Sequence, residues 1–328
     1  MIPRRKVIRI LAGGVLLTPL ALLAQSVKAP RRIGILMAGS SRSSARLTEA
    51  FRSGLKDHGW VEGRDVVIDI RHGNGDSSQF DRLATELVAL KPDLIFAPAT
   101  LPAQAVRRAS ADIPIVFAVS NDPIGSRLVA SWAHPGGNST GLSTIGAELG
   151  AKRLQLLREY VPKLTRVALL ADPTPGFSPD VLDMVLSAGK KLGIAISVVH
   201  AANEAEIGPA FARIERERPD GAFVLEGSLF LRHRQSVVAR AAAIRVPTVY
   251  PDGQYVEDGG LMSYGADYAD QSRRAATYAD KILRGVKPSD LPVEQPMRFE
   301  LIVNLKTAKT LGLKTPQSIL LRADKVIE

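Results

Sequence analysis

The sequence of 328 residues contains no cysteine, and only 5% of its residues are aromatic. The absence of cysteine excludes a disulfide scaffold, a thiolate metal site and a cysteine nucleophile. It also excludes a lipid-modified N-terminal cysteine, so we expect a protein that is not a lipoprotein. Because aromatic residues are few, the core must be built mainly from Ala, Val, Ile and Leu, which suits helices packed on buried parallel strands.

Signatures of catalysis and of cofactor binding are missing as well. No Gly-x-Gly-x-x-Gly or Gly-Lys-Ser/Thr follows the first expected strand, which argues against dinucleotide and P-loop sites. No Gly-x-Ser-x-Gly segment joins an expected strand to an expected helix, where a nucleophile elbow forms. The five histidines show no metal-ligand spacing; they are His58, His72, His134, His200 and His233. We therefore expect no catalytic residue, no metal and no cofactor.

Positive charge is abundant, with a formal net charge of +10. Four of the basic residues, Arg4, Arg5, Lys6 and Arg9, fall in the first ten positions. The others are scattered along the chain as pairs such as Arg107-Arg108 rather than gathered in one cluster. A solvated face explains such scattered charge better than a nucleic-acid interface, so we expect no nucleic-acid partner.

Residues 1–29 have the three parts of a secretory signal peptide. Residues 4–9 are basic, residues 10–24 are uncharged and mostly apolar, and small residues follow. Cleavage is expected after Ala24 or after Ala29, and we prefer Ala24 because a proline follows Ala29 directly. The sequence therefore predicts export to the periplasm.

The alternative for this segment is a membrane anchor. Its apolar run is shorter than the roughly 20 residues that a bilayer requires, and it contains Gly13, Gly14 and Pro19. The pair Arg4-Arg5 resembles a twin-arginine signal, which serves proteins that fold before export. Export by the Tat and by the Sec route both stay open.

From residue 31 onward the hydrophobic pattern alternates between strand and helix. In the first half, strands are expected at 33–37, 66–70, 94–97 and 115–118, with helices at 45–58, 80–90 and 102–109. In the second half, strands are expected at 166–171, 194–199, 219–224 and 246–250, with helices at 179–192, 205–217 and 229–244. This order indicates right-handed β-α-β units on parallel sheets.

The second half repeats the layout of the first. The spacing from Ile33 to Gly59 equals that from Val167 to Gly193, and the pattern Pro-Asp-x-x-Phe occurs at residues 92–96 and again at 219–223. The fold class is therefore α/β, with two doubly wound Rossmann-like lobes. Because such sheets bind ligands beyond the carboxyl ends of their strands, a small solute is expected between the lobes, enclosed by hinge closure.

The loops that follow the strands are rich in hydroxyl, amide and carboxylate groups. They are residues 39–44, 98–100, 120–123, 172–176, 226–228 and 251–252. Backbone N–H groups at a helix start attract a carboxylate, and Asp122, Asp172 or Asp252 could pair with an amino group. Together these groups suit a zwitterion such as an amino acid. The alternative for each residue is a helix N-cap, because the same residue types are favoured there without any ligand.

At this point several segments resemble one known family. His134–Gly141 resembles the Pro-Gly-Gly-Asn-x-Thr-Gly turn of a group of ABC transporter substrate-binding proteins that includes tryptophan- and tyrosine-binding members. Further matches are Gly59–Gly63, Ser120–Pro123, Ala188–Gly193, Tyr264–Tyr268, Lys281–Gly285, Leu291–Pro296, Asn304–Ala308 and Arg322–Glu328. The resemblance covers residues 31–328. No single segment is specific to the family, but the order and spacing of the segments are.

The resemblance implies a type I periplasmic-binding-protein fold, in which a multi-strand hinge joins the two lobes, with crossovers near 138–142, 261–265 and 288–298. The first lobe would take residues 31–141 plus about 265–295, and the second lobe 142–264. Residues 296–328 would complete the lobes and the hinge. The ligand contacts of the family map to eight residues of this chain: Ser40, Ser41, Thr100, Asn121, Asp122, Thr174, Ser228 and Asp252.

The resemblance also implies a monomer without catalytic activity that delivers a small polar solute to an ABC importer permease in the inner membrane. Two alternatives stay open, a sensory module for a membrane receptor or kinase and an enzyme on the same scaffold. The enzyme is disfavoured because no nucleophile, metal cluster or cofactor loop is found. A transcription regulator would need an N-terminal DNA-binding helix pair, and residues 1–30 are too short and too apolar for one.

Overall fold

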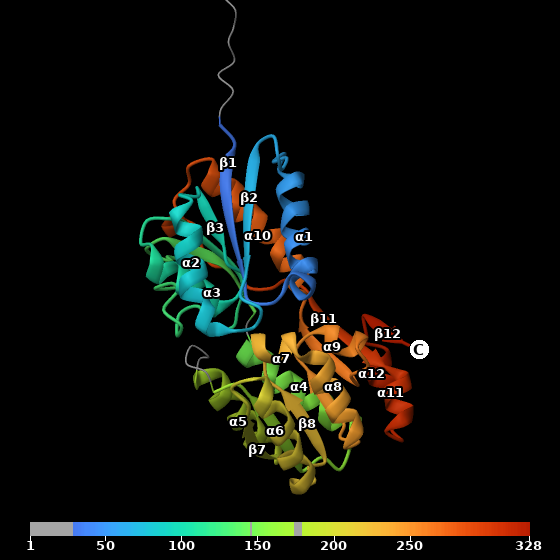
Figure 1. The fold of residues 1–328 in the computed structure, drawn as a ribbon. Helices are drawn as coiled ribbons and strands as arrows, with labels where there is room; N and C mark the ends of the chain where they lie inside the picture. The colour runs from blue at the N-terminus through green and yellow to red at the C-terminus, as the bar shows by residue number, and fades with distance from the viewer. Residues whose placement is uncertain (1–28, 145, 174–178) are drawn as a thin grey trace, which may run out of the picture.

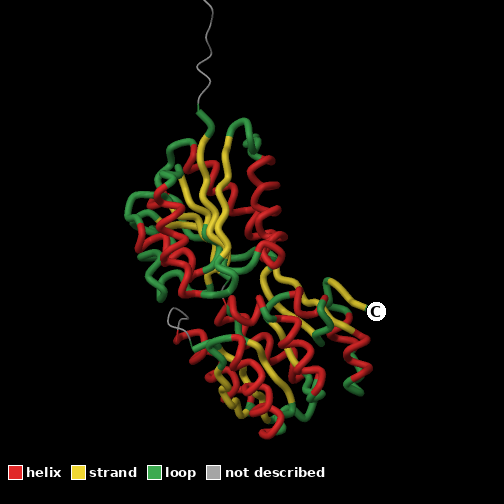
Figure 2. The backbone as a smooth tube through the Cα atoms, viewed as in Figure 1, coloured by secondary structure: helices red, strands yellow, loops and turns green. Residues whose placement is uncertain are grey.

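The computed structural model describes residues 29–328 apart from residue 145 and residues 174–178. The expected signal peptide lies almost wholly outside the described residues. The described chain forms two α/β lobes, one above the other in Figure 1. In each lobe the strands lie at the centre and the helices surround them, as Figure 2 shows. The predicted fold class is confirmed.

Lobe 1 contains a five-stranded parallel sheet with the order β2-β1-β3-β4-β5. Its strands are β1 (Arg31–Met37), β2 (Val66–His72), β3 (Leu94–Phe96), β4 (Ile115–Ser120) and β5 (Ser139–Ser143). Its helices are α1 (Ser41–Asp57), α2 (Phe80–Ala89), α3 (Thr100–Ala109) and α10 (Tyr268–Leu283), with short 3-10 turns η1 (Ser77–Gln79) and η2 (Pro288–Asp290). The central strands are buried apolar runs because helices cover both faces of the sheet.

Each face of the lobe 1 sheet has its own core. Helices α1 and α10 cover one face, where Phe51 stacks on Phe96 with ring centroids 4.0 Å apart. Helices α2 and α3 cover the other face and bury Phe80 and Val106. Helices α1 and α10 approach so closely at Gly54 that a Cβ atom there would lie 2.3 Å from the Arg273 carbonyl oxygen.

Lobe 2 contains a seven-stranded sheet with the order β12-β11-β10-β9-β8-β6-β7. Its strands are β6 (Arg166–Ala171), β7 (Ala195–His200), β8 (Gly221–Val224), β9 (Thr248–Tyr250), β10 (Met262–Ala266), β11 (Phe299–Asn304) and β12 (Lys325–Ile327). Its helices are α4 (Gly146–Tyr160), α5 (Pro179–Leu192), α6 (Glu204–Glu217), α7 (Ser228–Arg232), α8 (Arg234–Ala243), α9 (Gly253–Glu257), α11 (Leu305–Thr310) and α12 (Gln317–Leu320). The pairing is parallel except between β10 and β11.

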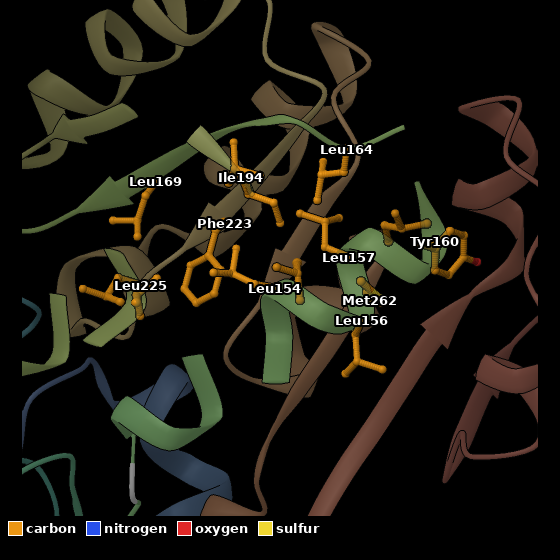
Figure 3. Packing of buried hydrophobic residues seen from close by; sticks show 14 of the residues in the cluster. Leu154, Leu156, Leu157, Tyr160, Leu164, Leu169, Ile194, Phe223, Leu225 and Met262 are labelled. Atoms are coloured by element: carbon orange, nitrogen blue, oxygen red, sulfur yellow. The ribbon is translucent and has the colours of Figure 1, made fainter. Parts of the chain in front are cut away.

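The lobe 2 core is also divided between two faces. On one face, Leu154 and Leu157 of α4 pack around Phe223 of β8 and Ile194, as Figure 3 shows. On the other face, α6, α8 and α9 bury Phe211, among others. The order β7-β6-β8-β9-β10 repeats the order β2-β1-β3-β4-β5 of lobe 1, so the two lobes share one topology.

The chain passes between the lobes three times. It passes first between β5 and α4, next between β10 and α10, and last between η2 and β11. The first and third passages are hydrogen-bonded to each other, because the Ser143 amide donates to the Glu294 carbonyl oxygen at 2.9 Å and the Glu294 amide donates to the Gly141 carbonyl oxygen at 3.1 Å. Gly141 has a φ of +149°, and a Cβ atom there would lie 1.9 Å from the Phe117 carbonyl oxygen, so this position of the hinge requires glycine.

Two expected helices differ from the structure. The helix expected at 229–244 is two helices, because the chain leaves helical geometry at His233, with φ of −97° and ψ of 22°. Hydrophobic periodicity misses this break because the buried residues on either side of it keep helical spacing. The helix expected from residue 45 begins at Ser41, since Ser40 caps it and its first turn was taken for a loop.

Candidate functional site

A cavity lies between the two lobes, at the carboxyl ends of their strands. Residues of both lobes border it. The polar residues among them include Ser43, Ser44, Thr100, Asn121, Asp122, Asp172, Glu226, Ser228, Arg232, Asp252, Tyr255 and Tyr268. The apolar residues include Met37, Leu47, Phe80, Leu101, Leu229 and Leu231. The cavity is therefore amphipathic, with apolar walls and polar groups that can orient a ligand.

On the lobe 1 side, the beginning of α3 borders the cavity. Ala99 at the N-cap position makes no side-chain cap, so the first amide groups of this helix stay available to an anionic group. Thr100 is the first residue of the helix, and its hydroxyl lies 3.1 Å from the Ser120 hydroxyl. The predicted residue Thr100 is thus placed where a carboxylate can be bound.

Asn121 and Asp122 follow β4 and border the same part of the cavity. The Asn121 side-chain oxygen accepts a hydrogen bond from the Thr144 hydroxyl, so the amide nitrogen is the group that can donate to a ligand. The Asp122 carboxylate accepts from the Gly125 amide at 2.7 Å. Asp122 therefore stabilises its own turn while it borders the cavity.

Ser40 and Ser41 are not among the residues that border the cavity. The Ser40 hydroxyl accepts from the Ser43 amide and serves as the N-cap of α1, and Ser41 is exposed in the first turn. Because the helix begins here, Ser43 and Ser44 are the residues that reach the cavity instead.

On the lobe 2 side, Glu226 and Ser228 follow β8, and Asp252 follows β9. Ser228 begins α7, where Gly227 makes no side-chain cap. Asp252 caps α9 by accepting from the Gln254 amide at 2.8 Å. Burial raises the pKa of the Asp252 carboxyl above its ordinary value. Thr174, the eighth predicted residue, lies outside the described residues.

A buried ion pair lies next to the cavity and was not predicted. Nη1 of Arg153 on α4 lies 2.5 Å from Oε1 of Glu226, and the two side chains are 1% and 7% exposed. The Arg153 Nε donates to the carbonyl oxygen of Tyr264 in β10 at 2.6 Å. Glu226 could have been found by its place after a strand, but nothing in the sequence links Arg153 to it.

Two buried tyrosines, one from each lobe, also border the cavity. Tyr255 on α9 is fully buried and stacks on Tyr250 with ring centroids 5.0 Å apart. Tyr268 begins α10, directly after the second passage between the lobes. Burial, and then nearby negative charge, raises the pKa of both phenols well above the ordinary value, so both hydroxyls keep their protons. Neither tyrosine is among the eight contacts predicted from the sequence.

Within residues 29–144, 146–173 and 179–328, no group of three or more His, Cys, Asp or Glu side chains is placed to hold a metal ion. The segment Gly137–Gly141 has the Gly-x-Ser-x-Gly spacing, but its Ser139 is buried at the start of β5 and does not occupy a turn between a strand and a helix. None of the helices in these ranges has the length and apolar character needed to cross a membrane.

Comparison with known proteins agrees with this geometry. Residues 32–327 match the family described as ABC transporter substrate binding protein. A tyrosine-binding protein of Clostridioides difficile is 26% identical over 287 residues, which cover 88% of this chain and 82% of that protein.

Two solved structures are informative about the fold. A Streptococcus pneumoniae domain in complex with L-Trp has 26% sequence identity and a TM-score of 0.86, with 91% of this chain and all of that chain covered. A ligand-free, open substrate-binding protein with adhesive properties from Clostridium difficile has 25% identity and a TM-score of 0.67, with 90% and 99% covered. Members of the family bind solutes outside the cytoplasm and serve ABC transporters. The chain belongs to the ABC transporter substrate-binding protein family.

Proposed function

We propose that this protein is a periplasmic receptor for an amino acid with a large apolar or aromatic side chain, which it delivers to the permease of an ABC importer. The observation that carries the proposal is the amphipathic cavity between the lobes. The binding of tryptophan and of tyrosine by two relatives supports the same class of ligand.

The apolar wall favours a bulky side chain. Phe80, Leu101 and Leu229, from α2, α3 and α7, belong to this wall. An aromatic side chain buries about 150–250 Å², which corresponds to roughly 4–6 kcal/mol at about 25 cal/mol per Å² before the costs of binding. A small hydrophilic solute would leave this wall without a partner, and its affinity would be correspondingly lower.

The polar groups favour a zwitterion. The uncapped beginning of α3 and the Thr100 hydroxyl offer donors to a carboxylate. Carboxylates bordering the same cavity, those of Glu226 and Asp122 among them, offer acceptors to an ammonium group. An amino acid is the simplest ligand that presents both charges beside an apolar side chain.

The arrangement of the lobes corresponds to a closed, binding-competent state. The chain superposes on the L-Trp complex with a TM-score of 0.86 but on the open, ligand-free protein with only 0.67, at nearly equal identity. Contacts across the cleft support this, since Arg232 of lobe 2 packs against Gly75 of lobe 1. Ligand contacts to both lobes would shift the equilibrium toward this state, and only this state would dock productively on the permease.

The remaining parts of the proposal concern the protein in the cell. The signal-like segment 1–29 directs export by Tat or Sec, and the mature protein begins after Ala24 or Ala29. The mature protein acts as a monomer without catalytic activity. Mass spectrometry of the protein recovered from periplasm tests the cleavage, and an intact N-terminus would contradict it.

Isothermal titration calorimetry of the mature protein against the proteinogenic amino acids tests the ligand class. We expect micromolar or tighter binding of an aromatic or large apolar amino acid, weaker binding of glycine and alanine, and no turnover of the ligand. Binding of sugars or polyols with no response to any amino acid would overturn the proposal.

A further inference from the structure

The charged residues at the cavity have the opposite sign to the rest of the chain. The chain carries a formal net charge of +10. Among its described residues, those bordering the cavity include the acidic Asp122, Asp172, Glu226 and Asp252 but only one basic residue, Arg232. A cavity of this composition favours a ligand with a positive charge, so the ammonium group is the part of the ligand most in need of a specific acceptor.

Glu226 is the strongest candidate for that acceptor. It lies just beyond the carboxyl end of β8, it borders the cavity, and its side chain is only 7% exposed. Arg153 contacts one carboxylate oxygen, Oε1. This contact is an ion pair, and neither carboxylate oxygen of Glu226 accepts a hydrogen bond from the described residues. A buried carboxylate oxygen without a partner is costly, and a ligand ammonium would supply the missing donor.

The ion pair alone gives no reason for a charged residue to occupy position 226. Burying two charges costs free energy that their attraction offsets only in part, and a pair of apolar residues is often as stable. What the pair does accomplish is orientation: Arg153 is fixed by its bond to the Tyr264 carbonyl oxygen and holds Glu226 at the cavity wall. Arg153 thus acts as a positioning residue.

Other acceptors surround the same point. Glu226, Asp252, Tyr255 and Tyr268 all border this cavity. The negative charges of Glu226 and Asp252 help to raise the pKa of the Tyr268 phenol, and that of Asp252 helps to raise the pKa of the Tyr255 phenol. The buried Tyr255 hydroxyl also has no hydrogen-bond partner among the described residues. Two carboxylates and two phenol oxygens provide the several acceptors that the three N–H donors of an ammonium group require.

We propose that Glu226, positioned by Arg153 and aided by Asp252, Tyr255 and Tyr268, forms the ammonium-binding subsite of the cavity. The ligand is then oriented with its amino group toward lobe 2 and the hinge, and with its carboxylate toward the beginning of α3 in lobe 1. This inference rests on the proposed function and adds to it the residue that selects for an amine.

The test uses three probes that share one indole ring: L-tryptophan, tryptamine, which lacks the carboxylate, and indole-3-propionate, which lacks the amine. Calorimetry measures their affinities for the wild type, for Glu226→Gln and for the matched control Glu257→Gln. Glu257 lies on α9 of the same lobe, pairs with Lys325 and does not border the cavity. We expect Glu226→Gln to lower the affinities for L-tryptophan and tryptamine at least 30-fold, and to change the affinity for indole-3-propionate less than threefold. Glu257→Gln should match the wild type for all three probes.

A second variant keeps the test informative if the unpaired Arg153 prevents Glu226→Gln from folding. The double variant Arg153→Met, Glu226→Leu removes both charges, and apolar replacement of a buried pair preserves folding in comparable cases. It should lose the preference for amines in the same way. Equal L-tryptophan affinity of the wild type and the folded variants would overturn the ammonium subsite alone. A wild type that binds no amino acid at all would overturn the proposed function.

Discussion

Substitution of Gly75 by alanine should weaken ligand binding by opposing the closure of the lobes. Gly75 lies in the turn between β2 and η1 of lobe 1, with a φ of +74°. Arg232 ends α7 of lobe 2, and a Cβ atom on Gly75 would lie 2.3 Å from its Cδ and 3.1 Å from its Nη1. An alanine there collides with Arg232 only when the lobes are closed, so the substitution penalises the closed state relative to the open one.

Two separate costs determine the size of the effect. The left-handed backbone conformation costs an alanine about 1 kcal/mol, and this cost is the same whether the lobes are open or closed. The collision is relieved when Arg232 leaves its preferred rotamer, which costs about 0.5–1.5 kcal/mol in the closed state alone. Because 1.4 kcal/mol is a factor of ten in affinity, the apparent Kd should rise about two- to tenfold.

Gly63 offers a matched control for the backbone cost. It lies in the loop before β2 of lobe 1 with a φ of +85°, and a Cβ atom there would meet nothing within 4 Å. Gly63→Ala and Gly75→Ala should therefore lower the free energy of unfolding by similar amounts in urea titrations of the ligand-free protein. In calorimetry with the amino acid that the wild type binds, only Gly75→Ala should bind more weakly.

The combination with Arg232→Ala makes the reasoning refutable. In an Arg232→Ala background the alanine at position 75 meets no guanidinium chain, so adding Gly75→Ala should leave the affinity unchanged. A Gly75→Ala protein with wild-type affinity, or a loss of affinity that persists in the absence of Arg232, would show that this contact does not control closure.

Two further predictions concern stability. Phe51→Ala removes a fully buried ring stacked on Phe96 and should lower the free energy of unfolding by about 3–5 kcal/mol in urea titrations. The control Val286→Ala, at an exposed position, should change the free energy of unfolding by less than about 0.5 kcal/mol. Equal effects of the two substitutions would contradict the assigned core. The hydrogen bond from the Thr165 backbone amide, aided by those from the Thr165 hydroxyl and the Arg166 amide, lowers the pKa of Asp220. Its stabilisation is therefore present above the unfolded pKa of about 3.9 and is lost as the pH falls through the lower folded pKa. The thermal midpoint of Asp220→Asn should lie below that of the wild type at pH 7 and converge with it near pH 2; a gap that widens in acid would refute this.

The fold was readable from the sequence because its central strands are buried on both faces. Runs such as Ile33–Met37 and Leu94–Phe96 are almost wholly apolar and are separated by helices of ordinary length. The repeated spacing predicted two lobes, and both have the same strand order. The break at His233 was not readable, since it depends on where α7 packs and the hydrophobic pattern continues through it.

The site could be predicted in part, because parallel strands place the residues that follow them at one edge of each sheet. Polar residues that follow strands reach the cavity, as Thr100, Asn121 and Ser228 do. Glu226 also follows a strand, but the prediction selected Ser228 from the same loop. Tyr268 could not be ranked from the sequence, because it reaches the cavity only after the chain has returned from lobe 2 to lobe 1.

That return also constrains how the protein can be made. Helix α10, at residues 268–283, buries Ala275, Ala276 and Ile282 against the same lobe 1 core as Phe51. A nascent chain that has emerged only as far as β5 therefore still exposes that face to solvent. Lobe 1 therefore cannot finish folding before lobe 2 is synthesised, whereas a continuous N-terminal domain could. Its completion waits until lobe 2 has been translated almost entirely, and until then the incomplete lobe exposes apolar surface of the kind that makes folding intermediates prone to aggregate.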